Sequence, residues 1–293
     1  MKIKILTSIY SDLSGTELGG RQSRGGHYQY SLLSLLKMTN ADFTCYTSER
    51  EIDRLKKFFY DEHNISEKQL ELKVFDLHKT KHEYLFQKYK DYESAKGGDR
   101  CLEIQWAKFT WYWLEDKSYD YYFWFDAGLS HCGLIPNKYL VGSNHPQQKY
   151  YESSLFNNDF LKNLIEDAGD KFILFGKEND RNFWSGTVKP KWYNEYDRRI
   201  HIIGGLFGGK KEMWEKVVPL FEEYAEKITP EERPHHEEVL MTVMYYNHQE
   251  LFERKHFDIW WCTDNCPSGT NPKIFEENKS FYRILEEFNR IYE

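Results

Sequence analysis

Short runs of apolar residues alternate along the chain with longer segments in which apolar residues recur every three or four positions. The short runs predict buried strands, and the longer segments predict amphipathic helices that pack on them. We predict strands at residues 3–9, 43–47, 70–75, 121–125, 171–175 and 201–207. We predict helices at residues 28–38, 102–113, 155–168, 210–228, 236–246 and 275–292. A further helix should follow Ser48, because Glu51 stands three positions later as in a capping box.

Strands and helices alternate through the first 76 residues, and this order predicts an α/β fold with a mostly parallel sheet and crossover helices. The 293 residues are enough for one large core or two small domains. Because the chain shows neither an internal repeat nor a low-complexity linker, we expect a single domain. No apolar run approaches the roughly 20 residues of a membrane span, so we expect none.

Composition narrows the class of protein further. The chain has 40 basic and 47 acidic residues, and a net charge of −7 disfavours nucleic acid as a partner. Five cysteines without an export signal favour a reduced, cytoplasmic protein. Cys262 and Cys266 lack a second pair that would complete a zinc site. The 9 Trp, 22 Tyr and 20 Phe fit either a large aromatic core or a site for sugars and nucleobases.

The strand at 121–125 runs directly into Asp126, followed by Ala127 and Gly128. A carboxylate at the carboxyl end of a strand in an open α/β sheet lies where ligands bind. The two small residues leave room for a ligand to approach the backbone. Asp126 could hold a ribose hydroxyl or a divalent cation, or it could simply cap the following turn.

Two further segments carry candidate chemistry. Residues 204–209 read Gly-Gly-Leu-Phe-Gly-Gly and lead into a helix, which fits either a pocket for a polyhydroxylated ligand or close sheet packing. His235, His236, Glu237 and Glu238 begin another helix. The two carboxylates there could act in catalysis or stabilise the helix N-terminus.

Arg21, Arg24, Arg100 and Lys108 form a basic set that could meet a diphosphate at the same edge of the sheet. Each of them alone is more typical of a solvated surface charge.

Taken in order, these parts resemble a GT-A glycosyltransferase: a nucleotide-binding α/β half, a strand ending in Asp126-Ala127-Gly128, a glycine-rich strand and an acidic helix start. The glycine-rich strand before an acidic helix is similar to the blood-group-type transferases. The residues Trp124 to Gly128, with Trp106-Ala107-Lys108 before them, are similar to the bacterial HtrL/YibB family. The resemblance implies one GT-A-like domain with a nucleotide-binding half at 1–128, a sugar and acceptor half at 129–265, and a tail and helix at 266–293.

The resemblance also implies which cofactor to expect. GT-A enzymes usually carry Asp-x-Asp, whose last carboxylate binds Mn²⁺ or Mg²⁺ on the donor diphosphate. Position 128 is glycine here, so a divalent cation would depend on Asp126, helped by His131 or His256. Metal dependence should therefore be weak or conditional.

The implied reaction transfers a sugar from a nucleotide-sugar, with a UDP-sugar favoured, to a hydroxyl of a glycan or lipid-linked acceptor. Its setting would be the synthesis of surface polysaccharide or glycan, in the cytoplasm or peripheral to the membrane. The implied donor-binding residues are Thr7 and Tyr10 at the base, Arg24, Lys108, Asp126 and Gly128 around the diphosphate and ribose, and Gly204, Gly205 and Phe207 at the sugar.

The implied catalytic residues are Glu238 and, second to it, Glu237. Such a glutamate is a general base if the enzyme inverts the anomeric centre and stabilises an oxocarbenium-like state if it retains it.

Two other classes of protein fit the same residues. A nucleotidyltransferase acting on a sugar phosphate would share the sheet and Asp126, and the loop from Gly15 to Gly26 would bind its phosphates. A non-catalytic carbohydrate-binding protein would use the abundant aromatic side chains.

Overall fold

The computed structural model describes residues 1–10, 25–79, 99–128, 158–178, 200–228 and 237–256. Within them lies one seven-stranded sheet with the order β3-β2-β1-β4-β6-β5-β7. The strands are β1 (Ile3–Ile9), β2 (Asp42–Thr47), β3 (Leu70–Val74), β4 (Tyr121–Phe125), β5 (Phe172–Glu178), β6 (Ile200–Lys210) and β7 (Phe252–His256). Only β6 runs antiparallel to its neighbours, β4 and β5. The predicted α/β fold with a mostly parallel sheet is confirmed.

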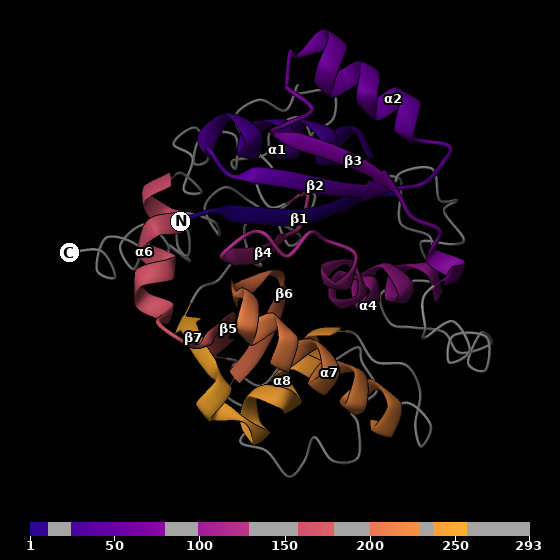
Figure 1. Ribbon diagram of the computed structural model, residues 1–293. Coiled ribbons are helices and arrows are strands. Elements are labelled where there is room, and N and C mark those ends of the chain that lie inside the picture. The colour runs from indigo at the N-terminus through magenta and orange to yellow at the C-terminus, as the bar shows by residue number, and fades with distance from the viewer. Residues whose placement is uncertain (11–24, 80–98, 129–157, 179–199, 229–236, 257–293) are drawn as a thin grey trace, which may run out of the picture.

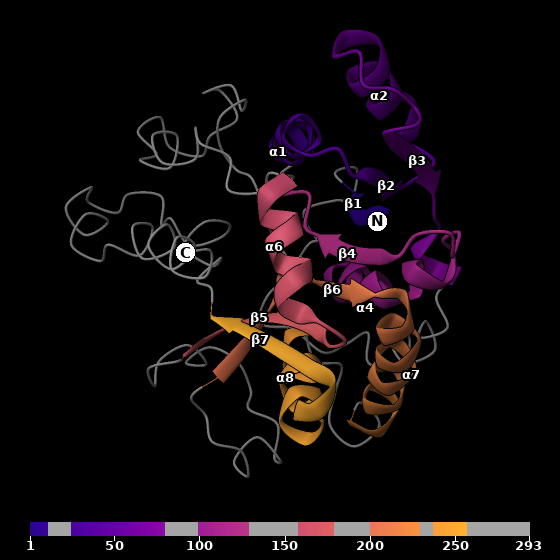
Figure 2. The same cartoon turned by 60° about the vertical axis from the view of Figure 1, so that its left-hand side comes forward.

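Helices cover both faces of this sheet (Figures 1 and 2). The α-helices are α1 (Gly25–Met38), α2 (Ile52–Lys56), α4 (Asp99–Trp113), α6 (Asn158–Ala168), α7 (Lys211–Ile228) and α8 (Glu237–Asn247). A π-helical segment, η1 (Lys57–Glu62), continues α2, and η2 (Leu77–Lys79) and η5 (Gln249–Leu251) are short 3₁₀ turns. Figure 2 shows α1 and α6 on one side of the sheet and α4 and α7 on the other.

Each face of the sheet has its own hydrophobic core, because successive strand residues point to opposite faces. On one face, Ile5 and Phe123 pack with Leu32 of α1 and Leu164 of α6. On the other face, aromatic residues of the strands pack with α4, α7 and α8. The largest fully buried side chains of this second core are Trp106, Trp111, Trp124, Trp214, Tyr46, Tyr112, Tyr122 and Phe109. Much of the aromatic excess therefore fills a core.

The close approach of β4 and β6 explains one of the glycines. Gly208 has a φ of +152°, and a Cβ there would lie 2.7 Å from the Cα of Phe123. A side chain at this position would separate the two strands.

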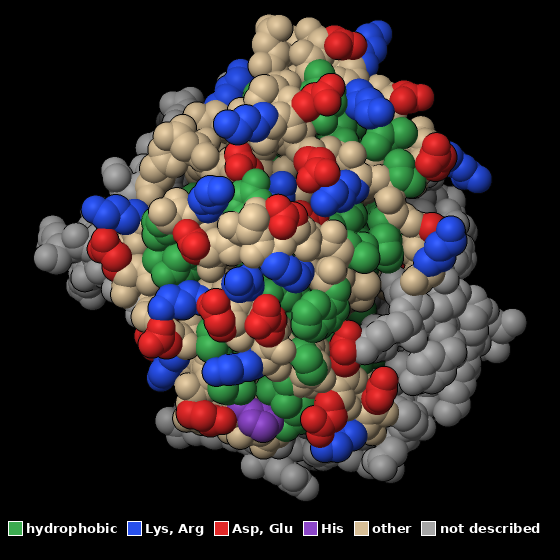
Figure 3. Space-filling model, in the orientation of Figure 1, with side chains coloured by type: hydrophobic (Ala, Val, Ile, Leu, Met, Phe, Trp, Pro, Cys, Tyr) green, Lys and Arg blue, Asp and Glu red, His purple; other side chains and the backbone are tan. Residues whose placement is uncertain are grey.

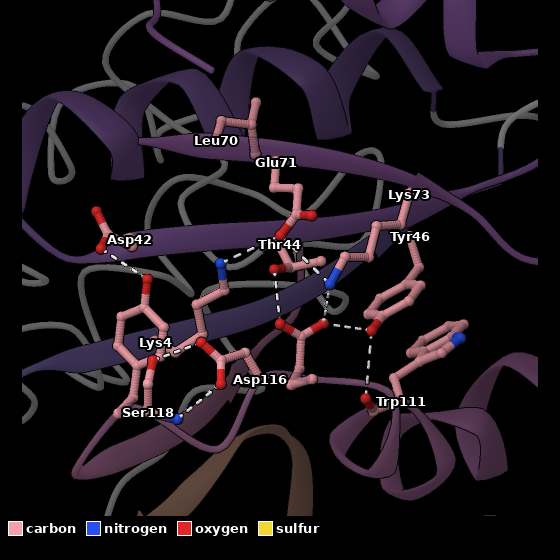
Figure 4. A network of polar contacts seen from close by, with 12 residues as sticks. Lys4, Asp42, Thr44, Tyr46, Leu70, Glu71, Lys73, Trp111, Asp116 and Ser118 are labelled. Atoms are coloured by element: carbon pink, nitrogen blue, oxygen red, sulfur yellow. Dashed lines mark hydrogen bonds and ion pairs between the residues drawn. The ribbon is translucent and has the colours of Figure 1, made fainter. Parts of the chain in front are cut away.

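The first three strands carry a buried polar network on the α4 side (Figure 4). Glu115, just after α4, accepts hydrogen bonds from Thr44 Oγ1 at 3.0 Å, Lys73 Nζ at 3.1 Å and the Tyr46 hydroxyl. The nearby carboxylate raises the pKa of Tyr46, which burial has already raised. All of these partners belong to the sheet or to the end of α4, so the network joins β2 and β3 to that helix.

The structure differs from the sequence-based elements in three places. Strand β7 was not predicted, because its residues Glu253, Arg254 and Lys255 interrupt any apolar run. The helix after Ser48 begins at Ile52 with Glu51 at its N-cap and without a side-chain cap, so the predicted capping box is wrong. Strand β6 continues through Gly208 and Gly209 to Lys210, whereas the predicted strand ends at residue 207. The predicted helix at 275–292 and the Cys262–Cys266 pair lie outside the described residues.

On the face shown in Figure 3, the described surface mixes charges of both signs. Its large exposed apolar side chains are Met1, Val74, Trp113 and Leu114. Of the helices in the described ranges, none has the length and apolar character needed to cross a bilayer.

Candidate functional site

The candidate site lies at the carboxyl end of β4, beside the point where the order of the strands reverses. The chain passes from β1 to β2 and β3 on one side and then returns to β4 on the other side of β1. The carboxyl ends of the strands at such a switch point are where open α/β sheets bind ligands. Asp126 is the first residue after β4, and its side chain is 41% exposed.

Two donors fix the orientation of the Asp126 carboxylate. Trp124 Nε1 donates a hydrogen bond of 2.6 Å to Asp126 Oδ1, and Lys108 Nζ lies 3.0 Å from the same oxygen. The backbone N–H of Asp126 also donates to the carbonyl of Gly205 over 2.8 Å. Among the described residues both side-chain donors act on Oδ1, which leaves Oδ2 as the oxygen available to a ligand.

Lys108 of α4 is the centre of the site. Its side chain is 5% exposed, and its ammonium donates to Glu237 Oε1 at 2.7 Å and to the Gly204 carbonyl at 3.0 Å. It also lies 5.2 Å from the centre of the Trp124 ring. Burial lowers the pKa of Lys108, but Asp126 and Glu237 outweigh that effect, so the net shift of its pKa is upward. Lys108 is therefore a buried cation shared by two carboxylates and one carbonyl, not the solvated surface charge that sequence statistics favour.

An irregularity in β6 brings the first turn of α8 against the glycines. The register with β5 shifts between Leu174 and Phe175, so residues 204–206 have no counterpart on β5. Glu238 Oε1 accepts a hydrogen bond of 3.1 Å from the Gly204 N–H. This bond replaces the one that the N–H would make to β5 in a regular sheet. A Cβ on Gly204 would lie 2.9 Å from Cδ of Glu237 and 3.2 Å from Cγ of Glu238. Position 204 therefore has to be glycine for the two carboxylates to reach the strand.

Thr242, one turn further along α8, makes the same kind of contact. Its Oγ1 accepts from the Ile202 N–H at 3.0 Å and donates to the Glu238 carbonyl at 2.7 Å. Glu237 and Glu238 are buried, at 2% and 9% exposure, although they occupy the first turn of a helix. Both side chains face the glycine-rich strand, and these interior contacts give both a role in packing.

A ladder of stacked rings leads from the end of β1 to Asp126. Tyr10 stacks on Trp111 at 6.1 Å between ring centres, and Trp111 stacks on Trp124 at 5.5 Å. The Tyr10 hydroxyl donates to the Phe75 carbonyl at 3.0 Å. Neither Trp111 nor Trp124 was predicted to bind a ligand; Trp124 stands in the motif that ends at Gly128, and only the aromatic excess of the sequence pointed to Trp111.

The structure does not bring Thr7 to Asp126. Ile5 and Ile9 belong to the core on the α1 side, and the alternation of side chains places Thr7 with them. Asp126 contacts Trp124 and Lys108, which lie on the opposite, α4 side of the sheet. Strands β1 and β4 are adjacent, but the side chains of Thr7 and Asp126 lie on different faces of the sheet, and the role of Thr7 at the base stays a prediction.

The glycine-rich strand contributes backbone to the site but not its aromatic ring. Phe207 is fully buried and stacks on Phe109 at 5.2 Å, so it belongs to the core and does not face a ligand. Gly204 and Gly205 contribute their carbonyls to Lys108 and Asp126, respectively. Gly128 is buried in the turn that follows β4.

Several predicted residues fall outside what the structure describes. Arg21, Arg24 and His131 lie in undescribed segments, and the side chains of Arg100 and His256 are likewise not described. Their predicted roles stay predictions.

The described residues do not fit the divalent cation that the resemblance implies. Within those ranges, no three or more His, Cys, Asp or Glu side chains converge as metal ligands. Glycine replaces the second carboxylate at position 128, and Lys108 already occupies the space between Asp126 and Glu237. Ca²⁺ takes six to eight oxygen ligands, and Mg²⁺ prefers an octahedral set of six. The described residues between Asp126 and Glu237 provide neither set of ligands.

Comparison with known proteins bears on the fold. A scan against protein-family models finds no match, and a search of curated proteins finds no relative. Among solved structures, apo mouse xyloside xylosyltransferase 1 matches with a TM-score of 0.52 at 12% identity, over 97% of this chain and 94% of that one.

Two synthetases match less well. A 4-diphosphocytidyl-2C-methyl-D-erythritol synthase from Anaerococcus prevotii DSM 20548 has a TM-score of 0.40 at 11% identity, over 87% of this chain and 86% of that one. A CMP:2-keto-3-deoxy-manno-octonic acid synthetase complexed with CTP has a TM-score of 0.38 at 11% identity, over 97% of this chain and 99% of that one. The xylosyltransferase has a TM-score above 0.5, and at 12% identity its likeness concerns the fold. The chain is thus similar in fold, over nearly its whole length, to a xylosyltransferase, in agreement with the GT-A-like architecture expected from its sequence.

Proposed function

We propose that this chain is a glycosyltransferase that moves a sugar from a nucleotide-sugar donor to an acceptor hydroxyl. The observation that carries the proposal is the Asp126 carboxylate, half-exposed at the switch point of a GT-A-like sheet and oriented by Trp124 and Lys108. A carboxylate oriented through one oxygen can accept a hydrogen bond from a ribose hydroxyl through the other. The likeness in fold to a xylosyltransferase supports this choice of reaction class.

In the proposed reaction, the bond between the anomeric carbon and the diphosphate oxygen breaks, and the anomeric carbon bonds to the acceptor oxygen. The acceptor proton passes to a carboxylate or to the departing diphosphate. Glu237 and Glu238 are the proposed carboxylates, since they lie on the same side of β6 as Lys108. The donor we propose is a UDP-sugar and the acceptor a glycan or a lipid-linked glycan, as in the HtrL/YibB-like role in surface polysaccharide.

The test begins with binding. Thermal-shift and calorimetric titration of the full chain with UDP, GDP, CMP, CTP, UDP-sugars and free oligosaccharides separates the classes, because a ligand of the native state raises its stability. We expect UDP and UDP-sugars to bind. Binding of CTP without any diphosphate would favour a nucleotidyltransferase instead, and binding of free oligosaccharides alone would favour a carbohydrate-binding protein.

The second step measures turnover. Release of UDP from a panel of UDP-sugars, with and without glycan acceptors, should reveal a donor whose cleavage the acceptor accelerates. Absence of nucleotide binding in the first step would overturn the proposal.

A further inference from the structure

The ammonium of Lys108 is surrounded as a bound cation would be. Three oxygens converge on it: Glu237 Oε1 at 2.7 Å, Asp126 Oδ1 at 3.0 Å and the Gly204 carbonyl at 3.0 Å. An ammonium has three N–H donors, so each donor has one acceptor and the set is complete. The face of the Trp124 indole, 5.2 Å away, adds a favourable cation–π contact.

The oxygens come from three separate elements, and Lys108 itself comes from a fourth. Asp126 follows β4, Gly204 belongs to β6, Glu237 begins α8, and Lys108 lies on α4. A single positive charge therefore ties the end of β4 to the irregular part of β6 and to the first turn of α8. Two carboxylates share that charge, so its loss would leave uncompensated negative charge around a buried position.

We infer that Lys108 is the resident cation of this site, in the place where a GT-A resemblance implies a divalent metal ion. Its role is that of a positioning residue: it holds Asp126 and Glu237 in their relative orientation, and no metal ion bridges these two carboxylates. The inference concerns the same site as the proposed function but does not need it, because stability is measured without any nucleotide or sugar.

Removing the side chain should convert this lysine site into a site for added cations. Lys108→Ala leaves the same three oxygens around an emptied volume, in which water molecules would complete the coordination shell of a bound cation. Lys108→Met fills most of that volume without charge. We expect both variants to melt roughly 10 °C below the wild type, because each breaks a buried ion pair. Millimolar Ca²⁺ or Mn²⁺ should then raise the melting temperature of Lys108→Ala by about 3 °C or more, and that of Lys108→Met and the wild type by much less.

The kind of cation gives a sharper criterion. Ca²⁺ takes oxygens at roughly 2.3–2.6 Å and Mg²⁺ at roughly 2.0–2.1 Å, so the surrounding oxygens must move less for Ca²⁺. We expect the shift with Ca²⁺ to exceed that with Mg²⁺. The n-propylammonium ion, which replaces the atoms missing from Lys108→Ala, should also stabilise that variant selectively.

A charge-balanced variant tests the same inference without added ions. Lys108→Met/Glu237→Gln removes one charge of each sign, and we expect it to melt above Lys108→Met alone. If Lys108→Ala does not fold, refolding from denaturant with and without Ca²⁺ provides the same comparison.

Three results would overturn the inference: a Lys108→Ala variant as stable as the wild type, equal cation effects on the Ala and Met variants, or a double variant no more stable than Lys108→Met. All three can occur whether or not the wild type binds UDP, so failure here is distinguishable from failure of the proposed function.

Discussion

The carboxylate of Glu237 accepts a hydrogen bond from the ammonium of Lys108 at 2.7 Å, although 129 positions separate the two residues in the chain. The contact joins α4, which packs on the first strands, to α8, which packs on β6. It therefore links the predicted nucleotide-binding half to the predicted sugar and acceptor half at the point where Asp126 leaves the sheet.

Gly204→Ala should destabilise the protein by roughly 1–3 kcal/mol, because its Cβ would overlap the carboxylate of Glu237. Gly209→Ala is the comparison variant, since a Cβ there would lie 3.2 Å from the Lys171 carbonyl oxygen, a tight contact that should cost less than the overlap at position 204. Urea denaturation of both variants and the wild type measures the difference. Equal losses for the two glycines would contradict the packing of Glu237 on β6.

Asp126→Asn should weaken UDP binding by roughly tenfold or more, because hydrogen bonds to charged groups are worth about 1.5–3 kcal/mol. The asparagine keeps an oxygen that can accept from Trp124 and Lys108, so the fold should persist. Calorimetric titration gives the affinity, and circular dichroism checks the fold. Asp53→Asn, at an exposed position on α2, is the control and should bind UDP like the wild type. Equal affinities for both variants would remove Asp126 from the proposed nucleotide site.

Glu238→Gln should lower turnover by roughly two to four orders of magnitude if Glu238 acts as a general base. The glutamine can still accept the hydrogen bond from the Gly204 N–H, so the melting temperature and the donor affinity should change little. Glu237→Gln is made in parallel, because a shift of one residue in the helix start would exchange the two roles. Turnover is measured with the donor and acceptor found in the activity screen. Near-wild-type turnover in both variants would limit the pair to a structural role.

The stability of the protein should show a pH dependence that originates at Lys117. Burial beside Tyr112, whose ring centre lies 3.6 Å from the ammonium, lowers the pKa of Lys117 to about 8 from an ordinary 10.5. Between these two pKa values the folded state binds fewer protons than the unfolded state, so its free energy of unfolding rises with pH. Below the lower value both states are protonated, and the cost of burying the charge is constant.

Lys117→Met removes this titration while keeping most of the length of the side chain. The free energy of unfolding of the wild type, measured relative to Lys117→Met by urea denaturation, should increase from pH 8 to pH 10. A difference that stays flat or falls over this interval would show that the folded protein does not lower the pKa of Lys117.

The sequence by itself determined the fold class and most of the elements. The apolar runs at β1 and β4 and the amphipathic pattern of α7 are local signals, because each strand or helix buries a face that its own residues define. The position of Asp126 could also be predicted, since a carboxylate directly after a buried apolar run lies at the carboxyl end of a strand and hence at the edge of the sheet. Strand β7 could not be predicted from its own residues, because they are mostly charged and the strand is supported by its pairing with β5, a distant segment of the chain.

The tertiary structure decided how the site residues meet. No local pattern distinguishes Lys108 from an exposed lysine on α4, and its burial becomes favourable only when Asp126 and Glu237 arrive from elements far along the chain. The alternation of side chains likewise separates Thr7 from Asp126, because the face on which each residue lies depends on the pairing of β1 with β4. Charge pairing and strand register are long-range properties, so they arise from the assembled sheet and not from any single segment.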